Sequence, residues 1–93
     1  MSSNYDTKEH FVFQLSVKIK SYILSMKPLI IESNAFIMHI YHYAFYEYIK
    51  KYENKLNIKK AEMFEYIKKA FLLAVSQIGF YEYRDGRYVI CEK

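Results

Sequence analysis

The sequence predicts an α+β fold in one domain, residues 1–93, with three helices followed by a C-terminal β-hairpin. Three observations carry this prediction. Apolar residues recur at three- and four-residue intervals through most of the chain, which is the spacing of amphipathic helices. An Asp-Gly pair near the C-terminus separates two runs of aromatic and β-branched residues, as in a tight hairpin. Hydrophobic residues make up 53% of the chain and charged residues 26%, a composition that favours a globular core.

The first predicted helix begins at Asp6 and ends before Pro28. Asp6 and Glu9 have the spacing of a capping box, in which the second side chain returns to the backbone of the first residue. Pro28 ends the helix because the residue before a proline is pushed out of the helical region. The predicted inner face consists of Val12, Leu15, Ile19, Tyr22 and Met26.

Residues 11–20 also fit a second interpretation, a half-buried strand. Phe11, Phe13 and Leu15 begin an alternation of period two that continues to Lys20. Such a strand would join the hairpin as the third member of a sheet. The cap at Asp6 and the lack of a turn residue before Pro28 favour the helix, and both interpretations stay open from the sequence.

The second predicted helix runs from a cap at Ser33-Asn34 to about Asn54. Its apolar residues cover most of the circumference, so we expect it at the centre of the fold or in an interface. They include Phe36, Ile37, Ile40, Tyr41, Ala44, Phe45, Tyr48 and Ile49.

The third predicted helix follows a cap at Asn57 and spans Ile58 to Ile78. Gly79 is the expected left-handed residue that closes it. The predicted inner face consists of Ala61, Phe64, Ile67, Phe71, Ala74 and Ile78.

Asp85-Gly86 predicts a type I′ turn, because that turn needs positive φ at both central residues. Arg84 and Arg87, the only arginines of the chain, then face each other at the tip. Continued without interruption, this pairing places Arg84, Arg87 and Glu82 on one side of the hairpin. The other side, expected to pack on the helices, carries Tyr81, Tyr83, Tyr88 and Ile90.

A candidate basic surface combines this tip with lysines of the third helix. The chain has a net charge of +4 and an isoelectric point near 9.1, which permits a polyanionic partner. Guanidinium groups bind phosphate well because they are planar and permanently charged. The lysines gather at the end of the second predicted helix and along the third: Lys50, Lys51, Lys55, Lys59, Lys60, Lys68 and Lys69.

From Tyr48 to Ile90, the order of helix, turn, longer helix, glycine and arginine-tipped hairpin resembles the winged-helix DNA-binding fold. The resemblance implies a small protein that binds double-stranded DNA, such as a transcriptional regulator. It also implies that the third helix enters the major groove while the hairpin contacts phosphate or the minor groove. The nucleic-acid-binding residues implied by the resemblance are Lys59, Lys60, Lys68 and Lys69 of the helix and Arg84 and Arg87 of the hairpin. Two features depart from the family pattern: the third helix is about a turn longer, and the second helix is long and almost wholly apolar.

The alternative interpretation is a homodimeric protein-interaction or structural module without a nucleic-acid role. Eleven tyrosines and seven phenylalanines supply more aromatic surface than a small monomer easily buries. We therefore expect a homodimer, formed through the first two helices. On this interpretation the lysines serve only to keep the surface soluble.

The sequence offers no support for an enzyme or a bound cofactor. Both glycines are used at a helix end and a turn, so no phosphate-binding loop exists. Cys91 has no neighbour that would activate it as a nucleophile. His39 and His42 lie one turn apart, but a metal site needs further ligands on the same face. We expect no metal and no small-molecule ligand.

The location expected from the sequence is cytoplasmic, inside a cell. The N-terminus lacks the pattern of a secretory signal, and polar residues interrupt the longest apolar stretch, so no membrane span is predicted. A single cysteine fits a reducing compartment. The abundance of Ile, Lys, Tyr and Phe is similar to that of small proteins from thermophilic archaea and their viruses.

Overall fold

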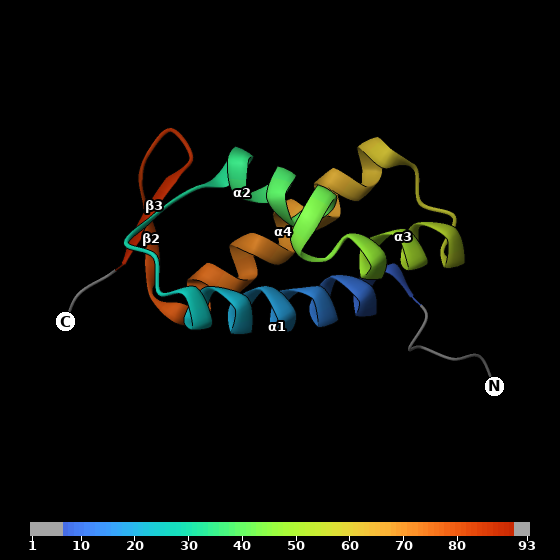
Figure 1. Cartoon of the computed structure of the whole chain (residues 1–93), viewed down its shortest axis with the longest axis horizontal. Helices are drawn as coiled ribbons and strands as arrows, with labels where there is room; N and C mark the ends of the chain where they lie inside the picture. The colour runs from blue at the N-terminus through green and yellow to red at the C-terminus, as the bar shows by residue number, and fades with distance from the viewer. Residues whose placement is uncertain (1–6, 91–93) are drawn as a thin grey trace.

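The computed structural model describes residues 7–90, with the backbone alone at Ile90. It is mostly helical, with a small antiparallel sheet at one end, so the predicted α+β class is confirmed (Figure 1). The helices number four in this part of the chain rather than three, because the second predicted helix is broken. The predictions that concern Asp6 and Cys91 fall outside the described residues.

Helix α1, Lys8–Met26, confirms the helical interpretation of residues 11–20 and shows that the strand interpretation was wrong. Its cap is Thr7, whose hydroxyl accepts a hydrogen bond from the His10 N–H at 3.0 Å. The helix ends at Lys27, which has φ 53°. The buried face is turned slightly from the predicted one and consists of Phe11, Leu15, Ser16, Ile19 and Ile23.

The second predicted helix is divided into α2 (Ser33–His39), a π-helical turn η2 (Ile40–Ala44) and α3 (Tyr46–Lys55). The π turn is closed by a hydrogen bond of 3.2 Å from the Phe45 N–H to the Ile40 carbonyl. An apolar surface on all sides of one straight helix cannot be buried against a small core. The extra residue in the turn and the break at Phe45 (φ −127°, ψ 33°) change the direction in which side chains point. Ile40, Tyr41 and Ile49 are all fully buried as a result.

The caps of the later helices also differ from those predicted. Glu32, rather than Ser33 or Asn34, caps α2 through a 2.8 Å bond from the Ala35 N–H. Asn57 lies in the turn with φ 55° and does not cap the next helix.

Helix α4 spans Lys60–Ile78 and ends at Gly79, whose φ of 109° confirms the predicted left-handed closure. Its buried face overlaps the predicted one at Ile67, Phe71 and Ala74, whereas Ala61 is exposed. The face is completed by Met63, Ala70 and Val75.

The sheet has three antiparallel strands in the order β1-β3-β2. The predicted hairpin is present as β2 (Phe80–Arg84) and β3 (Arg87–Ile90). The third strand is β1 (Ile30–Glu32), which the sequence reasoning missed. Three residues are too few to show an alternating pattern, so β1 is defined by its pairing with β3.

The hairpin turn is as predicted, but the register beyond it is not. Arg84 pairs with Arg87, and Asp85 and Gly86 have φ values of 42° and 82°. An irregularity between Glu82 and Arg84 then shifts the remaining pairs by one residue. Neighbouring residues of a strand point to opposite faces. The bulge therefore puts each of residues 80–82 on the face opposite to the predicted one.

The prediction that Tyr81 and Tyr83 pack on the helices was therefore wrong. These side chains are 51% and 58% exposed, whereas Phe80 is buried and Tyr88 packs against the core. Tyr81 pairs with Val89 instead. Glu82 pairs with Tyr88, and its carboxylate reaches the turn, where it accepts a hydrogen bond from the Gly86 N–H.

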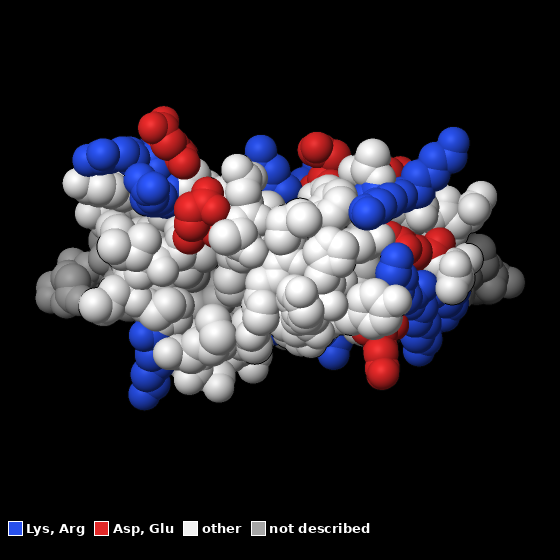
Figure 2. Space-filling view, turned by 45° about the horizontal axis from the view of Figure 1, so that its top comes forward, with Lys and Arg blue, Asp and Glu red and all other residues white. Residues whose placement is uncertain are grey.

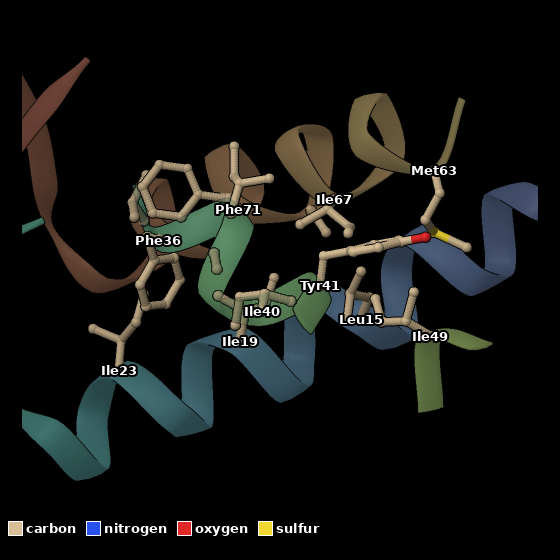
Figure 3. Close-up of a cluster of buried hydrophobic side chains, with 14 of the residues drawn as sticks. Leu15, Ile19, Ile23, Phe36, Ile40, Tyr41, Ile49, Met63, Ile67 and Phe71 are labelled. Atoms are coloured by element: carbon tan, nitrogen blue, oxygen red, sulfur yellow. The ribbon is translucent and has the colours of Figure 1, made fainter. Parts of the chain in front are cut away.

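One core lies where α1, the α2–η2 segment and α4 meet (Figure 3). Phe71 is central to it, because its ring contacts Phe36 at 5.4 Å and Tyr88 of β3 at 5.1 Å. The core thus joins the helices to the sheet. The molecule is elongated, with extents of 45 × 25 × 22 Å. Within residues 7–90, no helix combines the length and the apolar character needed to cross a bilayer.

We expect Gly86→Ala to destabilise the hairpin by about 1–2 kcal/mol, because φ 82° is strained for any residue with a Cβ. The added Cβ would also lie 2.9 Å from the Ser33 hydroxyl oxygen. The double variant S33A/G86A removes that close contact but keeps the backbone strain, so it should recover part of the loss. Chemical denaturation measures both, and a G86A variant as stable as the parent would contradict the packing described.

Candidate nucleic-acid interface

The hairpin tip presents both arginines on the outer face of the sheet. The Arg84 guanidinium lies 5.1 Å from the Tyr83 ring centroid and 3.4 Å from its hydroxyl. Neither Arg84 nor Arg87 forms an ion pair with a carboxylate of residues 7–90. Both charges are exposed and open to an anionic partner.

β1 and the start of α2 fix the tip to the body of the protein. The Ser33 N–H donates to the Gly86 carbonyl at 2.8 Å, and Glu32 pairs with Arg87 across the strands. An isolated two-stranded hairpin is marginally stable in water, and a third strand gives it support. The two guanidinium groups therefore project from an anchored element.

Three carboxylates lie in the same part of the molecule. Glu82 accepts a 3.1 Å bond from the Gly86 N–H, and Glu32 uses one oxygen to cap α2. Asp85 occupies the turn itself. These negative charges reduce the net positive potential of the tip, so binding of phosphate there depends on direct contact with the guanidinium groups.

The four predicted lysines are exposed along α4 and at its start. Lys59 and Lys60 stand at the N-terminus of the helix. The Lys59 side chain makes no capping hydrogen bond, and the Glu62 carboxylate in the first turn hydrogen-bonds to the Lys59 backbone. Cations at this end are unfavourable because the helix dipole is positive there. Lys68 and Lys69 follow in the middle of the helix, and the Lys69 ammonium lies 5.8 Å from the Tyr66 ring centroid.

The six predicted residues do not form one compact patch. α4 runs from the end of the molecule that carries α3 towards the end that carries the sheet (Figure 1). Lys60 and Lys69 are separated by about 14 Å of helix, at 1.5 Å per residue. Figure 2 shows the basic side chains in separate groups along the upper edge, with acidic side chains between them. The structure thus separates Lys59 and Lys60 from Arg84 and Arg87 by most of the long axis.

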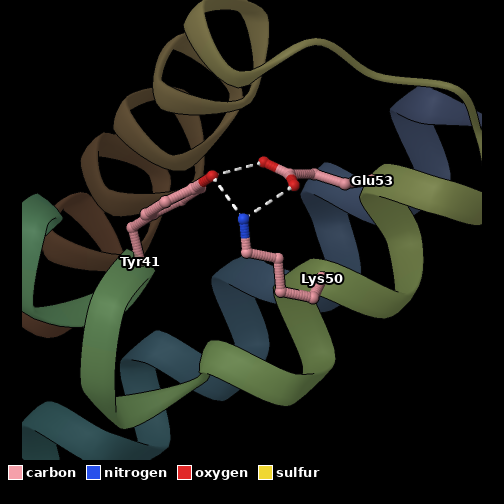
Figure 4. Close-up of polar contacts among 3 residues, drawn as sticks. All are labelled: Tyr41, Lys50 and Glu53. Carbon is pink, nitrogen blue, oxygen red and sulfur yellow. Dashed lines mark hydrogen bonds and ion pairs between the residues drawn. The ribbon is translucent and has the colours of Figure 1, made fainter.

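A polar cluster that the sequence reasoning missed joins η2 to α3 (Figure 4). The hydroxyl of the fully buried Tyr41 donates to Glu53 at 2.8 Å and accepts from Lys50 at 2.9 Å. Lys50 and Glu53 also form an ion pair of 3.2 Å. Burial raises the pKa of Tyr41, which keeps the hydroxyl protonated as a donor. The spacing of Lys50 and Glu53 was visible in the sequence, but nothing pointed to Tyr41.

We expect Tyr41→Phe to lower the free energy of unfolding by about 1–2 kcal/mol, because it removes two hydrogen bonds to charged groups. The loss stays moderate because Lys50 and Glu53 remain paired with each other. Tyr43→Phe, at a side chain that is 75% exposed, is the matched control and should change stability little. Denaturant unfolding compares the two, and equal stabilities would show that the cluster does not hold η2 against α3.

The histidines are engaged in aromatic contacts. His39 Nε2 lies 2.7 Å from the Tyr22 hydroxyl, with the two rings stacked at 5.9 Å. His42 packs edge-on against Tyr41 at 4.8 Å. Within the described residues, no group of three or more His, Cys, Asp or Glu side chains is placed to hold a metal ion.

Comparisons with protein-family models, with curated proteins and with solved structures find no match to this chain. Its function is therefore argued from its own geometry and charge.

Proposed function

We propose that this chain is a small DNA-binding protein of the winged-helix type. It binds the phosphates of a duplex through lysines at the start of α4 and along it and through the two arginines of the hairpin. These residues are Lys59, Lys60, Lys68, Lys69, Arg84 and Arg87. The observation that carries the proposal is the anchored tip, where both arginines of the chain project side by side without an acidic ion-pair partner among residues 7–90.

The start of α4 supports the same proposal. Two lysines at a helix N-terminus are unfavourable for the isolated helix, and among the residues of its first turn only Glu62 is acidic. A phosphate bound there would accept bonds from the free backbone N–H groups and neutralise both ammonium groups. An anionic ligand thus turns an unfavourable arrangement into a favourable one.

The separation of the basic groups fits a long ligand better than a compact one. The longest dimension of the molecule, 45 Å, equals the length of about 13 base pairs at 3.4 Å per step. A duplex laid along this axis would be long enough to reach from Lys59 and Lys60 to Arg84 and Arg87. In this binding mode the protein contacts the phosphate backbone, and no base-specific contact is proposed.

Titration of a random-sequence duplex with the full chain at several salt concentrations tests the proposal. Six phosphate contacts predict a slope of about −5 for the logarithm of affinity against that of salt, or roughly a thousandfold loss between about 50 and 200 mM. No retention at the lowest salt would refute the proposal.

A second candidate function, a protein-interaction module, is favoured by exposed apolar side chains. Tyr43 of η2 is 75% exposed, and Phe13 and Val17 of α1 are 52% and 48% exposed. Exposed aromatic residues are effective anchors in protein interfaces. If the duplex titration fails, this function becomes the better explanation of the surface.

A further inference from the structure

The outer face of the sheet is unusually apolar for a free surface. Six large hydrophobic side chains of the described residues are more than half exposed. Four of these six lie on the sheet or next to it: Leu29, Ile30, Tyr81 and Tyr83. The remaining two, Phe13 and Tyr43, belong to separate helical surfaces.

The register of the strands orders this face into two rows. In the first row, Ile30 pairs with Val89, and Val89 pairs with Tyr81. Directly paired residues point to the same side of a sheet, so these three side chains form an apolar row across all three strands. The alternate residue Ile31, which points inward, is 4% exposed.

The second row is charged and lies closer to the tip, by two residues along β1 and β3 and by three along β2, where the bulge adds one. Glu32 pairs with Arg87, and Arg87 pairs with Arg84. Because side chains alternate along a strand, this row shares the outer face with the apolar row. One edge of the face therefore carries an acid and the opposite edge a guanidinium.

Because of these two rows, the outer faces of two copies can pack against each other when one copy is rotated by 180° relative to the other. A two-fold axis parallel to β3 exchanges the edge strands β1 and β2 between two copies. Ile30 of one copy then lies over Tyr81 of the second copy, and Val89 lies over Val89. The same rotation sets Glu32 over Arg84 of the second copy. One oxygen of Glu32 caps α2, and its other oxygen would pair with that guanidinium, which gives two ion pairs per dimer. Only the Arg87 side chains meet a like charge, and each has Glu32 beside it in its own sheet.

We propose that a second copy of this chain covers the outer face of the sheet as an isologous dimer. Such interfaces use the same patch on both subunits and need this kind of self-complementarity. The dimer expected from the sequence, formed through the first two helices, would use a different surface. The dimer uses Arg84, so it competes with a duplex for that side chain.

Analytical ultracentrifugation of the full chain without nucleic acid tests the dimer. The parent should pass from monomer to dimer as its concentration rises. Tyr81→Lys should weaken the association at least about tenfold, because it places a charge in the apolar row. Arg84→Glu should weaken it as well, because it sets a carboxylate against Glu32 of the second copy. Tyr43→Lys, away from the sheet, is the control that should leave association unchanged.

Three outcomes would overturn the proposal. They are a parent that stays monomeric at every concentration, a Tyr43→Lys variant that dissociates as readily as Tyr81→Lys, and an Arg84→Glu variant that associates as well as the parent. Circular dichroism of each variant confirms that it is folded. The proposal does not depend on DNA binding, since a monomeric protein could still show the predicted salt dependence with a duplex.

Discussion

Phe71→Ala is expected to lower the free energy of unfolding by about 3–5 kcal/mol, the largest loss of stability that we predict. The Phe71 side chain is fully buried and contacts Phe36 of α2 and Tyr88 of β3. Its removal leaves a cavity where the helices meet the sheet, and neither neighbour can close it without moving an anchored element. A domain of this size has a total stability of roughly 5–14 kcal/mol, so a large fraction would be lost.

Phe13→Ala is the matched control, because it removes the same ring from a position that is 52% exposed on α1. It should cost less than about 1 kcal/mol. Denaturant unfolding of both variants gives the comparison, and the melting temperature of Phe71→Ala should fall by at least about 12 °C. A loss at Phe71 no larger than that at Phe13 would mean that the core does not join the sheet to the helices.

Replacing Arg84 and Arg87 together by alanine is expected to reduce the salt slope of duplex binding by about 2 and the affinity about ten- to a hundredfold at ~0.1 M salt. Each arginine is proposed to neutralise one phosphate, and each neutralised phosphate releases counterions. Stability should change by no more than about 0.5 kcal/mol, because both side chains are exposed.

The matched control is K18A/K51A, which also removes two positive charges from exposed positions but lies outside the proposed interface. If binding responded only to net charge, the two double variants would weaken it equally. The proposed interface requires the arginine variant to have clearly the larger effect. Fluorescence anisotropy with a labelled duplex, measured over a salt series, distinguishes these results.

The parts of the fold that local chemistry dictates could be predicted from the sequence. The turn at Asp85-Gly86 needs positive φ at two adjacent residues, and few residue pairs tolerate that. Gly79 closes α4 for the same reason. Their positions follow from backbone sterics alone, and the structure has both where the sequence placed them.

The parts that depend on contacts between distant segments could not be predicted. Tyr88 lies on the core side as predicted, but the bulge beside Tyr83 turns Phe80 rather than Tyr81 to that side. This preference exists only once β3 has Phe71 behind it. The break at Phe45 likewise reflects the need to bury Ile40, Tyr41 and Ile49 together. β1 is a strand because its backbone pairs with the edge of β3.

The residue types of the candidate interface were visible in the sequence, but their arrangement was not. Sequence spacing places Lys68 and Lys69 beside each other on one helix. It says nothing of the angle between α4 and the hairpin, which the core sets. The three carboxylates near the tip were also not foreseen as a group, because Glu32 reaches the arginines only through the pairing of β1 with β3.

NMR mapping of the backbone amide signals as a short duplex is added tests the proposed interface residue by residue. Binding as proposed shifts the signals of Lys59 and Lys60, those around Lys68 and Lys69, and those of residues 84–87, and added salt reverses all of these shifts. Shifts confined to the exposed face of α1 or to the aromatic residues near η2, or none at all, would contradict it.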